Sequence, residues 1–168
     1  MNSQQSRLLV VDDNEMNRDM LARRLARNGY LVDVAENAQQ LLQRVKENST
    51  DLVLLDIEMP EVSGFDALKA LRNDYSPIQL PIIMVTARNQ REDIVRALNL
   101  GANDYLTKPL DFPVALARIG TQLSNKRAQV TQVSGKRTTE SQLPGRRYVL
   151  GIPLQPMQRL SNLNPVPA

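Results

Sequence analysis

The chain has 168 residues, enough for one ordinary domain with a hydrophobic core and a remainder. It contains no cysteine and no histidine, which excludes disulfides, thiolate or histidine metal sites, Ser-His-Asp triads and phosphohistidine carriers. The net charge of +3 is uneven: residues 1–123 hold 14 Lys/Arg and 17 Asp/Glu, whereas residues 124–168 hold seven basic groups and one acid.

The first part of the chain predicts two strands and two helices. Residues 7–11 (RLLVV) form a continuous apolar run, as expected for a strand buried on both faces. Asn14 suits the cap of the following helix, and Gly29 suits its end. The apolar residues on one side of that helix are Met20, Leu21 and Leu25. Residues 30–35 (YLVDVA) predict the second strand. The next helix has apolar residues at i, i+3, i+4 and i+7, namely Ala38, Leu41, Leu42 and Val45.

The same alternation continues to about residue 127. Further strands are predicted at residues 51–55 (DLVLL), 81–85 (PIIMV) and 103–107 (NDYLT). The apolar positions of the three remaining helices are Leu68 and Leu71, then Ile94, Ala97 and Leu98, and finally Leu116, Ile119 and Leu123. Five strand–helix units in about 120 residues imply an α/β domain with a parallel sheet and helices on both faces.

Residues 128–168 differ in kind from residues 1–127, which we interpret as the domain. The stretch 124–168 holds five of the ten prolines and three of the seven glycines, without sustained periodicity. It therefore predicts a basic linker or disordered tail. The alternatives are contact of its paired basic residues with nucleic acid or an acidic surface, or a docking peptide or truncated further region at residues 148–160. No apolar run approaches a membrane span and the N-terminus does not resemble a secretion signal, so we expect a cytoplasmic protein.

Chemically active side chains follow the ends of the predicted strands. Asp12 and Asp13 follow the first, Asp56 the third, Thr86 the fourth and Lys108 the fifth. Because ligands bind beyond the carboxyl ends of parallel strands, these groups are expected to share one site. Three carboxylates repel unless a cation compensates, and Mg²⁺, with Mn²⁺ as the alternative, prefers such oxygen ligands. The set predicts phosphoryl transfer, which needs no general base because a carboxylate is already deprotonated at neutral pH.

Four segments resemble the signature regions of response-regulator receiver domains of two-component signalling: VVDDNEMNR, LVLLDIEMPEVSGFDAL, PIIMVTAR and GANDYLTKPL. The resemblance covers roughly residues 7–123, in the right order and spacing. It implies a CheY-like, flavodoxin-like (βα)5 fold, doubly wound, with five parallel strands in the order 2-1-3-4-5.

The resemblance also implies roles around the acceptor. Asp56 matches the phosphorylated residue, and Asp13 and Asp56 match direct metal ligands. The backbone carbonyl of Glu58 matches a third ligand, and Asp12 matches an acid that acts largely through a metal-bound water. Glu58 and Arg88 flank the route of water to the acyl phosphate, so they should influence its lifetime.

Further roles follow for the last two strands. Thr86 matches the hydroxyl that reorients toward the phosphoryl group, and the backbone of Ala87 is expected to contact that group. Lys108 matches the lysine that binds a phosphoryl oxygen. Pro109 matches a proline usually preceded by a cis peptide, and Tyr105 matches the aromatic that turns inward on phosphorylation.

The expected partner is a sensor histidine kinase or phosphotransfer protein. Phosphorylation should alter the face made by the fourth helix, fifth strand and fifth helix, and so change its affinity for a second copy or a downstream partner. The domain would not be an enzyme beyond its own phosphoryl transfer and dephosphorylation. Contacts with nucleic acid or membrane are not expected from it.

Several alternatives remain open. Asp12 and Asp13 could simply cap a helix, and Tyr105 could be an ordinary half-buried strand residue. A receiver-like module that signals without phosphate is the main rival. An aspartate-nucleophile phosphatase of the haloacid dehalogenase class is the least favoured, because the chain has D-I-E at residues 56–58 and no room for a substrate-enclosing cap. Both a stand-alone receiver and the N-terminal piece of a longer protein agree with the sequence.

Overall fold

The computed structural model describes the backbone of residues 4–87, 90–140, 148–149 and 152–153, and the side chains of residues 4–87 and 90–132. Five parallel strands form its main sheet: β1 (Arg7–Val11), β2 (Leu31–Ala35), β3 (Leu52–Asp56), β4 (Ile82–Thr86) and β5 (Asp104–Thr107). Their order is β2-β1-β3-β4-β5, and every neighbouring pair is parallel. The predicted doubly wound, flavodoxin-like fold is confirmed.

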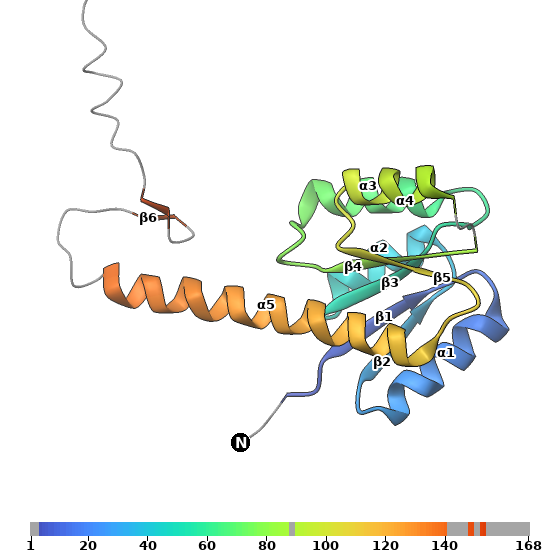
Figure 1. Cartoon of the computed structure of the whole chain (residues 1–168), viewed down its shortest axis with the longest axis horizontal. Helices are drawn as coiled ribbons and strands as arrows, with labels where there is room; N and C mark the ends of the chain where they lie inside the picture. The colour runs from blue at the N-terminus through green and yellow to red at the C-terminus, as the bar shows by residue number, and fades with distance from the viewer. Residues whose placement is uncertain (1–3, 88–89, 141–147, 150–151, 154–168) are drawn as a thin grey trace, which may run out of the picture. The chain divides into compact units, whose positions relative to one another are not determined.

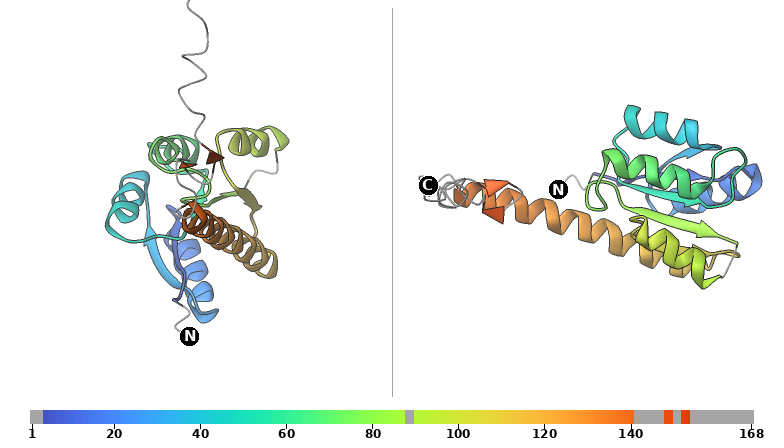
Figure 2. Two further views of the ribbon diagram at one scale, coloured as in Figure 1. Left: turned by 90° about the vertical axis from the view of Figure 1, so that its left-hand side faces the viewer. Right: turned by 90° about the horizontal axis from the view of Figure 1, so that it is seen from above.

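Helices cover both faces of the sheet (Figures 1 and 2). They are α1 (Glu15–Arg27), α2 (Ala38–Glu47), α3 (Gly64–Asp74), α4 (Arg91–Asn99) and α5 (Phe112–Glu140). The buried side chains form two clusters, one on each side of the sheet. One cluster joins the sheet to α2, α3 and α4, and the other joins it to α1 and α5. The alternation of strand side chains between the faces explains this division, because Leu8 and Val10 belong to one cluster and Leu9 and Val11 to the other.

Polar caps fix the helices that follow the strands of the candidate site. The side chain of Asn14 accepts a hydrogen bond from the backbone N–H of Asn17, as predicted for the start of α1. Ser63 caps α3 in the same way through the N–H of Asp66. Gly29 follows α1 with a φ of 90°, a conformation that costs glycine little. These caps set where the turns after β1 and β3 end.

Two predicted core positions are wrong. Met20 in α1 is 55% exposed and Leu98 in α4 is 43% exposed. Each lies next to a better-centred residue, Leu21 or Ala97, whose side chain is buried against the sheet. A helix advances by 100° per residue, so the neighbour of a central core position points to the edge of the buried stripe.

The last helix is longer than the sequence predicts. The tail was expected from residue 128, but α5 continues to Glu140. No proline and only one glycine, Gly135, lie between residues 124 and 140, so the helix meets no strong breaker there. The chain divides into two units, residues 1–126 and 127–168. The second unit includes the short antiparallel pair β6 (Tyr148–Val149) and β7 (Ile152–Pro153). Within the described residues, no helix is long and apolar enough to cross a bilayer.

Candidate functional site

Asp12 and Asp13 lie in the turn between β1 and α1. Asp12 is buried, with 7% of its surface exposed, and its Oδ1 accepts a hydrogen bond from the N–H of Asn14 at 2.9 Å. Its backbone carbonyl accepts a second bond from Nη1 of Arg18 at 3.0 Å. Asp13, by contrast, is exposed. The turn therefore holds one carboxylate rigidly at the edge of the sheet and leaves the next one open to solvent.

Asp56 ends β3 on the neighbouring strand and is only 3% exposed. Its Oδ1 accepts a hydrogen bond from the backbone N–H of Glu58 at 3.1 Å. The pKa of Asp56 is raised from 3.8 to about 6 as a net result: burial raises it most and the charge of Asp12 also raises it, whereas Lys108 and the N–H of Glu58 lower it. The carboxylate is thus held in an environment that disfavours its own charge.

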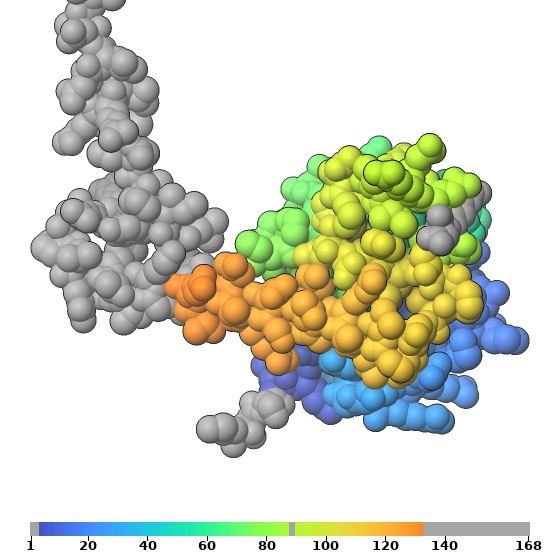
Figure 3. All heavy atoms as spheres, viewed as in Figure 1, coloured from blue at the N-terminus to red at the C-terminus, as the bar shows by residue number. Residues whose placement is uncertain are grey.

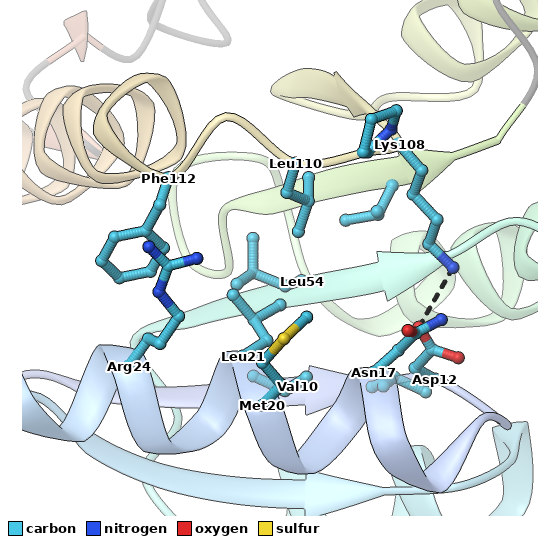
Figure 4. Close-up of a pocket in the computed structure, with 13 residues that line it drawn as sticks. Val10, Asp12, Asn17, Met20, Leu21, Arg24, Leu54, Lys108, Leu110 and Phe112 are labelled. Carbon is cyan, nitrogen blue, oxygen red and sulfur yellow. Dashed lines mark hydrogen bonds and ion pairs between the residues drawn. The ribbon is translucent and has the colours of Figure 1, made fainter.

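Lys108 bridges the two buried carboxylates from the end of β5. Its Nζ donates to Oδ2 of Asp12 at 3.1 Å and to Oδ2 of Asp56 at 3.3 Å, and Figure 4 shows the first of these contacts. Burial lowers the pKa of Lys108, but the charges of Asp56 and Asp12 outweigh this effect, so the net shift is upward. Its backbone N–H donates to the carbonyl of Thr86 at 2.8 Å, and the peptide bond between Lys108 and Pro109 is cis.

The three carboxylates are close enough to share one cation. One oxygen each of Asp12, Asp13 and Asp56 lies within 4.8 Å of the other two. All three donors are carboxylate oxygens, the ligand type that Mg²⁺ prefers. Within this group, three carboxylates face the single ammonium of Lys108, so a divalent cation would balance the remaining two charges. The residues present therefore fit a hard divalent metal.

Thr86 and Tyr105 lie on the last two strands beside the acid cluster. Thr86 ends β4 and is 1% exposed, whereas Tyr105 in β5 is half-buried. Met84 is paired with Tyr105 in the sheet, and Thr86 comes two residues after Met84. Because strand side chains alternate, Thr86 and Tyr105 lie on the same face of the sheet, toward α3 and α4.

The other predicted positions are less tightly placed. Glu58 is exposed in the loop after β3, where its backbone N–H donates a hydrogen bond to Oδ1 of Asp56. Ala87 is exposed directly after β4. Arg88, expected to influence the lifetime of the acyl phosphate, lies outside the described residues.

Two residues that support the site were missed by the sequence analysis. Gly64 begins α3 so close to β3 that an added Cβ would lie 2.2 Å from the carbonyl oxygen of Asp56. A glycine in the first turn after a serine cap was a usable indication of such close approach. Arg18 binds the carbonyl of Asp12, and its only sequence indication was its position one turn after the cap Asn14.

Comparison with known proteins agrees with this fold. The model of the response regulator receiver domain family matches residues 8–120. The transcriptional regulatory protein DltR of Streptococcus agalactiae is 42% identical over 113 residues, which are 67% of this chain and 50% of DltR. HprR of Escherichia coli, also a transcriptional regulatory protein, is 34% identical over 122 residues, covering 73% of this chain and 53% of HprR. The chain thus spans about half the length of these curated relatives.

Solved structures agree with the curated relatives. A CheY-like receiver domain protein from Methanospirillum hungatei superposes with a TM-score of 0.70 at 29% identity, covering 75% of this chain and 99% of that one. A putative two-component response regulator/GGDEF domain protein gives a TM-score of 0.71 at 32% identity, covering 74% of this chain and 51% of that one. The family model matched over residues 8–120, the curated relatives and the CheY-like structure place this chain in the family of response regulator receiver domains of two-component systems.

Proposed function

We propose that the chain is a phosphoacceptor switch in which Asp56 takes a phosphoryl group from a phosphohistidine donor. One Oδ of Asp56 forms a bond to phosphorus, the bond from phosphorus to the imidazole nitrogen of the donor breaks, and the imidazole leaves with the electron pair. The observation that carries the proposal is the bridge of Lys108 between Asp12 and Asp56 at 3.1 and 3.3 Å. It places an ammonium group beside the acceptor, where phosphoryl oxygens would arrive.

The supporting residues have separate tasks in this proposal. Asp12, Asp13 and Asp56 would hold Mg²⁺, with the backbone carbonyl of Glu58 as a further ligand. When bound, the metal supplies charge that offsets the carboxylates and the incoming phosphoryl oxygens. Lys108 contacts one phosphoryl oxygen, and the backbone of Ala87 contacts another. No base is required, because Asp56 with a pKa of about 6 is mainly ionised at neutral pH.

Thr86 and Tyr105 would carry the change from the acceptor to the surface. Phosphorylation adds negative charge next to a buried hydroxyl on the adjacent strand, and Thr86 turns toward that charge. Tyr105, on the same face of the sheet, follows into the space that Thr86 leaves. The guanidinium of Arg118 lies 5.3 Å from the Tyr105 ring and donates to its backbone carbonyl, so the movement reaches α5. The switch is a shift in population between two packings.

The face formed by α4, β5 and α5 would be the output surface, and Figure 3 shows this side of the protein. It carries the partly exposed apolar residues Val95, Leu98 and Val114. We propose that phosphorylation changes its affinity for a second copy of the chain or for a downstream partner. The protein would not turn over an external substrate, and its catalysis would be limited to its own phosphorylation and dephosphorylation.

Intact mass spectrometry tests the acceptor. The full chain is incubated with acetyl phosphate and Mg²⁺, beside Asp56→Asn and the matched control Asp51→Asn, whose carboxylate lies at the opposite end of β3. One base-labile phosphoryl adduct on the wild type and on Asp51→Asn, but absent from Asp56→Asn, supports the proposal. Absence of an adduct from the wild type, with Mg²⁺ binding shown separately, would favour a receiver-like module that signals without phosphate.

Light scattering tests the output surface. With acetyl phosphate and Mg²⁺, we expect a rise in average mass for the wild type that Leu98→Asp suppresses without loss of the adduct. Ile78→Asp is the matched control, because Ile78 is 51% exposed in the loop before β4 and belongs to none of α4, β5 and α5. A rise that both variants suppress equally would contradict the assignment of this face to self-association.

A further inference from the structure

A cavity of about 440 Å³ lies between α1 and the segment that joins β5 to α5 (Figure 4). Its floor is made by the sheet residues Val10, Leu54 and Val85, whose side chains are almost completely buried. Its walls are also apolar and are formed by Met20, Leu21, Leu110 and Phe112. The volume is in the range of cavities that bind small molecules.

The two ends of the cavity differ in charge. At one end, Lys108 lies between Asp12 and Asp56, so its positive charge is already offset by two carboxylates. At the other end, the guanidinium of Arg24 stacks 4.2 Å from the centre of the Phe112 ring. Within the described part of the chain, no carboxylate lies within ion-pair distance of Arg24. The cavity therefore offers an anion one favourable end and one repulsive end.

We propose that this cavity binds a small amphipathic anion, such as an aromatic or branched aliphatic carboxylate. The apolar body would lie against Leu21, Leu54 and Leu110, and the anionic group would meet Arg24. A guanidinium stacked on an aromatic ring is preorganised and can bind a carboxylate through two parallel N–H donors. The repulsion from Asp12 fixes the orientation, since an anion placed at the Lys108 end would approach two carboxylates.

Occupancy would also affect the candidate phosphorylation site. The same cavity is lined by Asp12, Asn17 and Lys108, so a bound body restricts the side chain of Lys108 and its movement toward a phosphoryl group. We expect slower phosphorylation by acetyl phosphate when the cavity is filled. This consequence rests on the proposed function, whereas the binding itself does not.

The binding test uses 8-anilinonaphthalene-1-sulfonate, an aromatic sulfonate, as the probe. It is titrated into the full chain, with stoichiometry from calorimetry and the folded state checked by circular dichroism. We expect saturable binding of one probe, weakened at least fivefold by Arg24→Gln and only partly restored by Arg24→Lys, which keeps the charge but not the two parallel N–H donors. Arg27→Gln removes one positive charge from the same helix outside the cavity and should leave affinity unchanged. The uncharged N-phenyl-1-naphthylamine should bind the wild type and Arg24→Gln equally.

A second variant tests the location of the probe. Met20→Trp places a larger side chain at the exposed rim and should abolish binding while the protein stays folded. The proposal is overturned if the probe does not saturate, if Met20→Trp binds it as the wild type does, or if Arg24→Gln and Arg27→Gln weaken it equally. These outcomes do not depend on whether Asp56 accepts phosphate.

Discussion

At the carboxyl edge of the sheet the ammonium group of Lys108 lies beside a cluster of three carboxylates, whereas at the opposite edge a half-buried guanidinium is surrounded by neutral oxygens. The second group belongs to Arg72 in α3, and burial lowers its pKa to about 10. Its acceptors are the backbone carbonyls of Gly101, Leu80, Tyr75 and Ser76 and the side-chain oxygen of Asn103. The carboxylate of Asp56 is repelled by the charge of Asp12, and a bound cation would relieve this repulsion. The guanidinium of Arg72, in contrast, already has its hydrogen-bond acceptors within the protein. The first arrangement suits a reversible charge change, and the second suits stability.

The largest expected effect follows from removing Arg72. Arg72→Leu should lower the free energy of unfolding by about 3–5 kcal/mol, because several acceptors, most of them partly buried, lose their donor together. Urea denaturation measures this loss, with Arg44→Leu, an exposed arginine in the last turn of α2, as the control expected to change stability by less than about 0.5 kcal/mol. If Arg72→Leu and Arg44→Leu lower the free energy of unfolding equally, the hydrogen bonds of Arg72 do not have the stabilising role assigned to them.

Removing the charge of Asp56 should stabilise the fold, whereas removing Arg72 destabilises it. The pKa of Asp56 rises from 3.8 in the unfolded chain to about 6 in the folded protein, so its ionisation destabilises the fold as the pH rises through 6. Without metal, Asp56→Asn should therefore raise the free energy of unfolding at pH 7–8 by up to about 3 kcal/mol. The gain should disappear below about pH 4. Thermal unfolding across this pH range checks both parts, and a gain independent of pH would show that charge is not its cause.

Mg²⁺ should stabilise the protein through the carboxylates at the carboxyl edge of the sheet. At a Mg²⁺ concentration one hundred times its Kd, the wild type should gain about 2.7 kcal/mol in the free energy of unfolding. Asp13→Asn should lose most of this gain, since it removes one of the three clustered carboxylates. Asp66→Asn, an exposed acid in α3, serves as the control. If Asp13→Asn and the wild type respond alike, the metal binds elsewhere.

The smallest effect concerns the loop between Asp56 and Gly64. Glu61 has a φ of 67°, a left-handed conformation that residues other than glycine disfavour. Glu61→Gly removes this conformational strain and should raise the free energy of unfolding. The gain should be less than about 1 kcal/mol, because glycine also loses more backbone entropy on folding. Glu61→Ala should give no gain. If Glu61→Ala stabilises the protein, the charge of Glu61, and not its backbone conformation, is what destabilises the wild type.

The sheet could be predicted from the sequence because its central strands are continuous apolar runs that end in chemically distinct residues. Asp12 and Asp56 were identifiable for the same reason: each is the first acid after such a run. Arg72 was not predictable, since its acceptors are backbone carbonyls that only the folded chain brings together. Met20 and Leu98 were expected to be buried, because helical spacing shows which residues share one side of a helix but not which of them lies at the middle of the buried face. The cavity beside Lys108 depends on how far α1 stands from the β5–α5 segment, which no local pattern encodes.

The contact between Lys108 and Asp12 also has a consequence for how the protein is made. The two residues are 96 positions apart, and they meet only when the last strand has joined the sheet. During synthesis, which starts at the N-terminus, Asp12 and Asp56 therefore leave the ribosome before Lys108 does. Such a nascent chain lacks the ammonium group proposed to bind the phosphoryl oxygens. Competence to accept a phosphoryl group in the proposed way would thus arise only when the synthesis of the domain is complete.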